Sequence, residues 1–366
     1  MRLAFVDITY GYAADRPEAV EALGGTTSAV CFLARELVKT GVDCSFFNKI
    51  DAPRTVHGIP ALPLQALADA VHDPSYSAFI FCGRWMEDMV RLIKGSTKAP
   101  LIAWMHESTF NPKLVPMLDE FNAIAFVSEW QQRINQPFVK PHWKQIVARN
   151  AMNPLAANMF SPAEKICDAK IKPPILFYAG SFPRGAFHLP KVLERLRAAQ
   201  SDFSVEVFCN INPSNHEESD AKYIAWMRSL PGITHVGMVG QTELVRRMKT
   251  AAFMMAPNPW PETSCIAMIE CMAAGLSVIT TNRAALPETT SGFARQVAIE
   301  DADHSLRFDA PIDYVKFAAV VDEAMREWVQ QPDVTEQKLR KQVDYFNAHY
   351  QWSQRVAPWV EFVKSL

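Results

Sequence analysis

Residues 257–290 read PNPWPETSCIAMIECMAAGLSVITTNRAALPETT, and this stretch decides the fold. The apolar run Ala252–Asn258 leads into it and predicts a strand, and the apolar run Val278–Asn282 predicts another. Between them we expect a helix with Thr263 or Ser264 as its N-cap, because a hydroxyl there can accept a hydrogen bond from a free backbone N–H. Strand, helix and strand together predict one βαβ unit of a parallel sheet.

Two carboxylates stand in this unit, Glu262 in the expected loop and Glu270 in the expected helix. The helix around Glu270 is almost wholly apolar, so a carboxylate there is costly unless a partner satisfies it. Hydroxyl groups of a ligand are one possible partner. The alternative is an ordinary loop Glu262 and a buried Glu270 paired with Lys or Arg, and spacing alone favours that alternative slightly.

The same alternation of short apolar runs and longer helical stretches extends over the whole chain. Most of the apolar runs do not alternate with polar residues, as is typical of parallel strands buried on both faces. A polar segment at 154–174 separates two such series, which predicts two doubly wound α/β domains, residues 1–160 and 172–349. The expected strands are Leu3–Asp7, Cys44–Asn48, Ala78–Gly83, Leu101–His106, Ala123–Ser128, Ile175–Gly180, Val205–Asn210, Ile233–Gly237, Ala252–Asn258 and Val278–Asn282.

The C-terminal residues, about 350–366, are expected to form one more helix. Their apolar residues recur at spacings of three and four, which gives a single apolar face. We expect this face to cover a core, and a helix that binds a partner protein is the alternative. The residues of the face are Trp352, Val356, Trp359, Val363 and Leu366.

Composition disfavours several classes of protein. The 366 residues have a formal net charge of −2, whereas nucleic-acid binders normally show a basic stripe. No apolar stretch approaches the roughly 20 residues that span a bilayer, and the N-terminus lacks a signal-peptide core. The seven cysteines include no CxxC pair, which is typical of reduced thiols in the cytoplasm.

In doubly wound sheets, ligands bind outside the carboxyl ends of the strands, so residues that follow strands are candidates. Gly24 and Gly25 open a predicted helix, where free N–H groups can bind a phosphate, although a tight turn and helix cap would look the same. His106 ends a predicted strand and is either a site residue or a structural histidine. The chain lacks a GxGxxG fingerprint, which disfavours a dehydrogenase.

Glu262 and Glu270 resemble the E-x7-E signature of retaining glycosyltransferases of family 4 (GT4). The stretch Met272–Val278 is similar to the E-A-M-A-x-G-x-P-V sequence that follows the signature, with Ser277 where proline is usual. The likeness extends over nearly the whole chain. Further landmarks in the family's order are Gly24-Gly25, His106, Val127-Ser128, Asn150, Ala179-Gly180, Gly237–Gly240 and the Trp352–Trp359 tail.

The resemblance implies the GT-B fold: two Rossmann-like domains that face each other across a cleft, with the C-terminal helix crossing back to the first. It implies that Glu270 binds ribose hydroxyls. Glu262 and the backbone amides of Thr263, Ser264 and Cys265 would bind the donor sugar and its diphosphate.

The resemblance also implies roles for residues outside the signature. Gly25 would bind donor phosphates with Gly24 beside it in the donor site, and His106 would contact the sugar near its reacting carbon. The backbone around Met238 and Val239 would contact the base.

Two departures from the family pattern concern the donor site. The family usually has Arg and then Lys-Gly to hold the diphosphate, whereas this chain has Ser181 and then Arg184-Gly185. One cation is therefore replaced, and Arg184 alone or with Arg149 would have to stabilise the leaving group. Thr263–Cys265 replaces the common G-F-G, which leaves the sugar preference open.

The function that the resemblance implies is transfer of a sugar from a UDP, GDP or ADP sugar, with retention and by front-face displacement, with no cofactor and no metal. The acceptor would be a glycan, a lipid-linked glycan or a small molecule, in cell-surface polysaccharide or glycoconjugate synthesis. We expect the protein in the cytoplasm or at the inner face of the membrane. Asp301-Ala302-Asp303 matches a DxD metal motif, but we interpret it as a solvated loop.

Two alternative functions and the class of the acceptor remain open. The first is a non-catalytic protein of the same fold that binds a nucleotide sugar or a partner enzyme, which the loss of the cation at Ser181 favours. The second is a sugar epimerase of the same fold, although the sequence marks no acid and base groups for it. The acceptor loop is the third open question, because the composition of Thr9–Leu23 selects no acceptor class.

Overall fold

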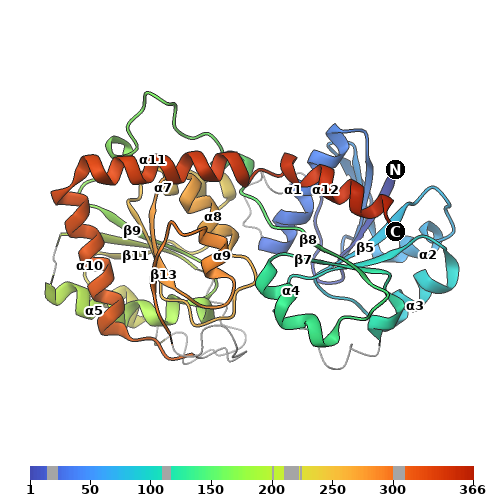
Figure 1. The fold of residues 1–366 in the computed structure, drawn as a ribbon, viewed down its shortest axis with the longest axis horizontal. Helices are drawn as coiled ribbons and strands as arrows, with labels where there is room; N and C mark the ends of the chain where they lie inside the picture. Colours follow the sequence, from blue (N-terminus) through green and yellow to red (C-terminus); the bar gives the residue numbers. More distant parts are fainter. Residues whose placement is uncertain (15–23, 109–116, 200–201, 210–221, 223–224, 300–309) are drawn as a thin grey trace. The chain divides into compact units, whose positions relative to one another are not determined.

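The computed structural model describes residues 1–14, 24–108, 117–199, 202–209, 222, 225–299 and 310–366 (Figure 1). The described chain divides into two compact units. The first holds the residues up to Pro154 together with Gln351–Leu366, and the second holds Leu155–Tyr350. Each unit has a parallel sheet with helices packed on it.

The first unit is built on an eight-stranded sheet of order β3-β4-β2-β1-β5-β6-β7-β8. Its strands pair in parallel except for the antiparallel hairpin of β3 and β4. The central strands are apolar on both faces because helices cover both. The strands are β1 (Arg2–Val6), β2 (Asp43–Asn48), β3 (Arg54–Val56), β4 (Ile59–Pro63), β5 (Ala78–Cys82), β6 (Leu101–Trp104), β7 (Ala123–Phe126) and β8 (Lys144–Val147).

The helices of the first unit include the C-terminal one. They are α1 (Gly25–Lys39), α2 (Leu67–Ala70), α3 (Glu87–Ser96), α4 (Glu129–Asn135) and α12 (Ser353–Lys364). Helix α12 packs on α1, and Trp359 lies edge-on against Trp104 with ring centroids 5.0 Å apart. The apolar face of the C-terminal residues therefore covers the core of the first unit, as its spacing predicts.

The second unit is built on a six-stranded, wholly parallel sheet of order β11-β10-β9-β12-β13-β14. Its strands are β9 (Ile175–Ala179), β10 (Ser204–Phe208), β11 (Ile233–His235), β12 (Phe253–Ala256), β13 (Ser277–Thr281) and β14 (Arg295–Val297). Its helices are α5 (Leu189–Ala199), α7 (Gln241–Thr250), α8 (Ile266–Ala273), α9 (Leu286–Thr290), α10 (Tyr314–Gln330) and α11 (Pro332–His349), and two single turns, η7 (Phe182–Arg184) and η8 (Ala186–His188), follow β9.

All ten strands expected from the sequence are present, with ends that differ by one or two residues. The apolar pattern of the sequence does not predict the strands β3, β4, β8 and β14. Strand β3 is short and largely exposed and β8 is only partly buried, so neither has the continuous apolar run of a central strand. No helix of the described residues is both long and apolar enough to cross a membrane.

Candidate functional site

In the second unit, the order in which successive strands are added to the sheet reverses between β9 and β12. These strands are neighbours, with Leu176 opposite Phe253, while β10 and β11 extend the sheet on one side and β13 and β14 on the other. Ligands of open parallel sheets bind beyond the carboxyl ends of the strands at such a switch point. The loops that follow β9 and β12 contain Arg184 and Glu262, so the topology brings these two side chains together.

Glu262 is a buried carboxylate with a positively charged partner. Its side chain is 5% exposed, and the Nη1 atom of Arg184 lies 3.2 and 3.3 Å from its two oxygens. The amide of Asn258 is 3.4 Å from Oε1. The Arg184 side chain is 46% exposed, and its Cζ lies 5.6 Å from the ring centroid of Trp260. One guanidinium thus contacts a carboxylate and an aromatic face while still reaching water.

The loop after β12 is held in place through Asn258. Its side-chain oxygen accepts a 2.8 Å hydrogen bond from the backbone N–H of Trp260, which forms an Asx turn. Its carbonyl accepts a 2.6 Å bond from Thr281, which lies at the end of β13. The backbone oxygen of Glu262 accepts a 3.0 Å bond from the N–H of Ala285. Glu262 is therefore fixed from β13 and from the loop beyond it.

The predicted N-cap is wrong. Helix α8 begins at Ile266 with Cys265 as N-cap and no side-chain capping bond, so neither Thr263 nor Ser264 has that role. The backbone pairing of Glu262 with Ala285 keeps the chain in a loop past both hydroxyl residues. The first turn of α8 has no acidic residue.

Glu270 lies in the middle of α8 and is 5% exposed. Its neighbours Met268, Ile269, Cys271 and Met272 are buried as well, which is the apolar setting that the sequence predicts. A carboxylate in that setting needs a polar partner, either from the protein or from a ligand. Its role toward ribose stays a prediction.

In the first unit, His106 follows β6 and its ring centroid lies 4.8 Å from that of Trp104. Burial lowers the pKa of His106 to about 3, so the imidazole is neutral at pH 7 and can offer one donor and one acceptor. Gly83, with φ +84°, follows β5, and a Cβ there would lie 4.0 Å from His106 Cβ and 3.7 Å from Thr26. Next to Thr26, Gly25 begins α1 with Gly24 as N-cap. These residues therefore share one sheet edge.

Asp7 also lies at this edge of the first unit, although its sequence context predicts only the end of a strand. It is 1% exposed and follows β1 directly. Its Oδ1 accepts bonds of 2.8 and 3.3 Å from the N–H groups of Thr9 and Tyr10. Burial raises its pKa above the ordinary value, although these bonds act in the opposite direction. The available signal was an acidic residue at the end of a buried strand.

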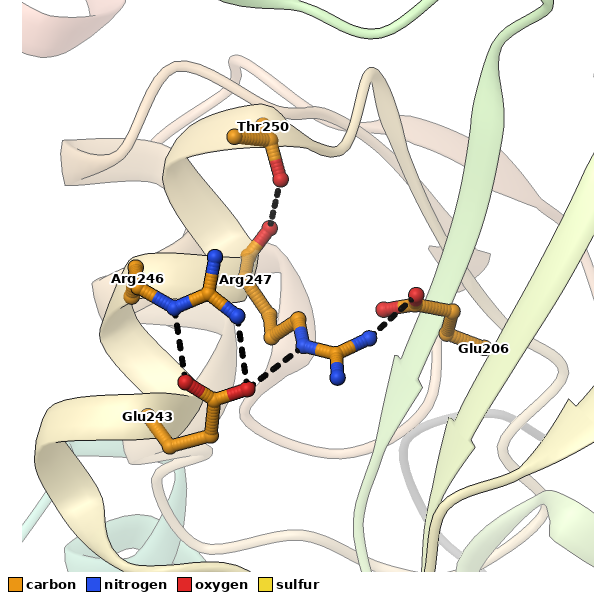
Figure 2. A network of polar contacts seen from close by, with 5 residues as sticks. All are labelled: Glu206, Glu243, Arg246, Arg247 and Thr250. Carbon is orange, nitrogen blue, oxygen red and sulfur yellow. Dashed lines mark hydrogen bonds and ion pairs between the residues drawn. The ribbon is translucent and has the colours of Figure 1, made fainter.

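Met238 and Val239 lie between β11 and α7, and the Met238 side chain is 55% exposed. An ion-pair network fixes α7 behind them (Figure 2). Arg247 bonds Glu206 of β10 at 2.6 Å and Glu243 at 2.7 Å, and Arg246 makes two further 2.7 Å bonds to Glu243. These bonds hold the pKa of Glu243 down at about 2. The segment that is expected to contact a base thus precedes a well-anchored helix.

The two family departures have different surroundings. Ser181 is exposed, and its backbone oxygen accepts a 3.1 Å bond from the N–H of Arg184. Arg149 belongs to the first unit and lies 2.8 Å from Glu129. Asp301-Ala302-Asp303 and most of the loop Thr9–Leu23 lie outside the described residues. Within the described part of the chain, no group of three or more His, Cys, Asp or Glu could hold a metal ion.

Residues 173–306 match the family model described as glycosyl transferases group 1. No curated protein sequence matches the chain. Among solved structures, the chain is similar to a sucrose-phosphate synthase from Thermosynechococcus elongatus (TM-score 0.70, 13% identity, 100% of this chain and 98% of that one). It is also similar to a glycosyltransferase from Rickettsia africae (TM-score 0.72, 13%, 100% and 98%) and to Anabaena HepE in complex with UDP and glucose (TM-score 0.70, 11%, 100% and 100%). The fold is GT-B: two Rossmann-like domains and a C-terminal helix.

Proposed function

We propose that this chain is a retaining glycosyltransferase that moves a sugar from a nucleotide-diphosphate sugar to an acceptor hydroxyl. One observation supports the proposal above all others. Arg184 and the buried Glu262 lie 3.2 Å apart at the point where the strand order of the second sheet reverses. Both residues belong to the 173–306 segment that matches glycosyl transferases group 1. A cation beside a carboxylate close to the N-terminus of a helix suits a ligand with both phosphate and hydroxyl groups.

The charge that develops during transfer identifies the role of each group. The bond between the anomeric carbon and the phosphate oxygen breaks, so negative charge grows on the leaving diphosphate. Arg184 and the N–H groups at the head of α8 stabilise that charge. The acceptor oxygen attacks the same face of the sugar and passes its proton to the leaving phosphate oxygen. Positioning and electrostatics, without a covalent intermediate, lower the barrier.

Glu262 then accepts hydrogen bonds from sugar hydroxyls, and Glu270 binds the ribose. Arg184 partners Glu262, and because the Arg184 side chain is 46% exposed it has room to turn toward a phosphate. The side-chain amide of Asn258, 3.4 Å from Oε1, is a second polar neighbour of the Glu262 carboxylate. Neutralisation by Arg184 and helix amides makes the proposed reaction independent of metal.

The donor and acceptor classes extend the proposal. UDP is the first donor nucleotide to test, because the similar Anabaena protein is described with UDP and glucose. The acceptor is a glycan, a lipid-linked glycan or a small molecule, and the pathway is synthesis of cell-surface polysaccharide or glycoconjugate. A cytoplasmic location is consistent with the seven cysteines, none of which forms a disulfide.

A second candidate is a non-catalytic protein of the same fold that binds a nucleotide sugar or a partner enzyme. Ser181 favours it, since an exposed serine stands where the family usually has a second cation. The two candidates differ in turnover. A binding protein would hold the donor without transferring its sugar or hydrolysing it slowly.

The test begins with calorimetric titration of UDP, GDP and ADP in the presence of EDTA. Sugars of the nucleotide that binds best are then assayed for transfer and hydrolysis. Glu262→Gln should abolish turnover and leave folding intact. The matched control is Glu323→Gln, which should have no effect. Glu323 is an exposed glutamate on α10, 3.4 Å from Arg295 of β14.

Each outcome has a definite meaning. Binding with turnover that only Glu262→Gln removes supports the enzyme. Tight binding without any turnover across the donor panel supports the second candidate. Wild-type rates in Glu262→Gln would remove that residue from the site. A lack of binding by all three nucleotides would contradict the enzyme and would leave, of the second candidate, only a protein that binds a partner enzyme.

A further inference from the structure

The loop after β9 is wrapped around one tyrosine. Tyr178 is the fourth residue of β9 and is 2% exposed. Its hydroxyl donates a 3.0 Å hydrogen bond to the backbone oxygen of Ser181. Burial raises the pKa of Tyr178 well above its usual value of 10.0, so the phenol keeps its proton, and a weaker, opposite effect comes from a hydrogen bond with the backbone of Ala186. The hydroxyl therefore bonds both ends of the segment 181–186.

Two glycines let the loop approach this ring. At Gly180, a Cβ would lie only 2.9 Å from the Tyr178 hydroxyl oxygen. At Gly185, where φ is +143°, a Cβ would lie 3.1 Å from Cε2 of the ring and 3.3 Å from the carbonyl oxygen of Pro257. Any other residue at either position would press on the ring. The glycines and the tyrosine thus form one packed unit.

Arg184 lies inside the segment that this unit fixes. Its backbone N–H donates to the Ser181 oxygen at 3.1 Å, the same oxygen that accepts from Tyr178. Its side chain lies 3.2 Å from Glu262 and over the ring of Trp260. We infer that Tyr178 is a positioning residue for Arg184. By bonding the backbone on both sides of Arg184, the phenol holds the guanidinium where the leaving diphosphate would be bound.

The inference rests on the proposed function for the identity of the ligand. In the sequence, Tyr178 is one more aromatic residue in an apolar strand. Its function follows from the direction of its hydroxyl, which faces the loop and not the core.

The test is Tyr178→Phe, which keeps the ring that the glycines contact and removes only the hydroxyl. The probe is whichever of UDP, GDP and ADP the wild-type protein binds best by calorimetry. Affinity should fall by about three- to tenfold, the range expected for losing one or two ordinary hydrogen bonds. In an Arg184→Ala background the same substitution should have no further effect, because Tyr178 acts through Arg184.

The matched control is Phe177→Leu. Phe177 precedes Tyr178 on β9, is fully buried and has its ring centroid 4.8 Å from that of Phe208. This change should lower thermal stability and leave nucleotide affinity at the wild-type value. An equal loss of affinity in Phe177→Leu would overturn the inference, because the effect would then be general to the strand.

A second measurement requires no ligand. The side-chain Nε–H signal of Arg184 in a nitrogen-15 NMR spectrum is assigned by its loss in Arg184→Lys. Tyr178→Phe should shift or broaden this signal, and Phe177→Leu should not. If no nucleotide binds the wild-type protein, the proposed function fails and this signal alone decides the inference. A wild-type signal in Tyr178→Phe, or an undiminished effect in the Arg184→Ala background, would overturn it.

Discussion

Replacing Arg184 by alanine removes the charged partner of a carboxylate that water barely reaches. The exposed fractions differ sharply, 5% for the Glu262 side chain and 46% for Arg184. Removing one partner of a fully buried pair costs about 3–5 kcal/mol, whereas an exposed pair contributes about 0–1 kcal/mol. Because Arg184 is half exposed and Asn258 stays near Glu262, we expect Arg184→Ala to lower the free energy of unfolding by about 2 kcal/mol.

The assay is a double-mutant cycle in which the free energy of unfolding of each variant is measured by urea denaturation, with circular dichroism as the signal. Glu262→Gln removes the charge, so Arg184→Ala in that background should cost less than about 0.5 kcal/mol, which gives a coupling energy of at least about 1 kcal/mol. Turnover should fall about 100- to 1,000-fold in Arg184→Ala, as for the loss of one group that stabilises developing charge. Arg91→Ala is the control for both measurements, because this arginine of α3 and its partner Glu87 are both exposed. Equal destabilisation in both backgrounds would refute the account of the pair.

Three further changes test other parts of the molecule. Glu270→Ala should weaken binding of the preferred nucleoside diphosphate by about tenfold or more, since hydrogen bonds to charged groups contribute about 1.5–3 kcal/mol; an unchanged affinity would return Glu270 to a structural role. Ser181→Arg should raise turnover if a second cation is limiting, and an unchanged rate would mean that Arg184 suffices. Burial lowers the pKa of Lys170 to about 7 against 10.5 when unfolded. The unfolded chain then binds more protons across this interval, so stability should rise between about pH 7 and 10.5. In Lys170→Met the slope should disappear, and a retained slope would assign it to other groups.

The sequence predicts the architecture well because central parallel strands have a strong apolar signal. It also selects Glu262, in the loop after a predicted strand, while Arg184 is selected only through the resemblance to the family. It does not predict that they bond each other, since 78 residues separate them and only the adjacency of β9 and β12 brings them together. That adjacency is a property of the sheet and leaves no local pattern in the chain.

The errors have local physical causes. Thr263 and Ser264 are good N-caps by composition, but a backbone bond between Glu262 and Ala285 delays the start of α8 to Ile266. The residues around Thr263 do not predict this bond, because its two partners are more than twenty residues apart in the sequence. Tyr178 was missed because burial alone does not reveal which way a hydroxyl points.

The packing of α12 on α1 has a consequence for synthesis on the ribosome. Trp104 and Phe32 are made before the second unit, whereas the aromatic residues that cover them, Trp359 and Trp352, are made after it. The residues of the second unit, Leu155–Tyr350, emerge entirely in between. A chain in translation therefore exposes this apolar surface of α1 and β6 while the second unit is made, and a chaperone that binds nascent apolar segments should dissociate from it only after residues 351–366 have left the exit tunnel.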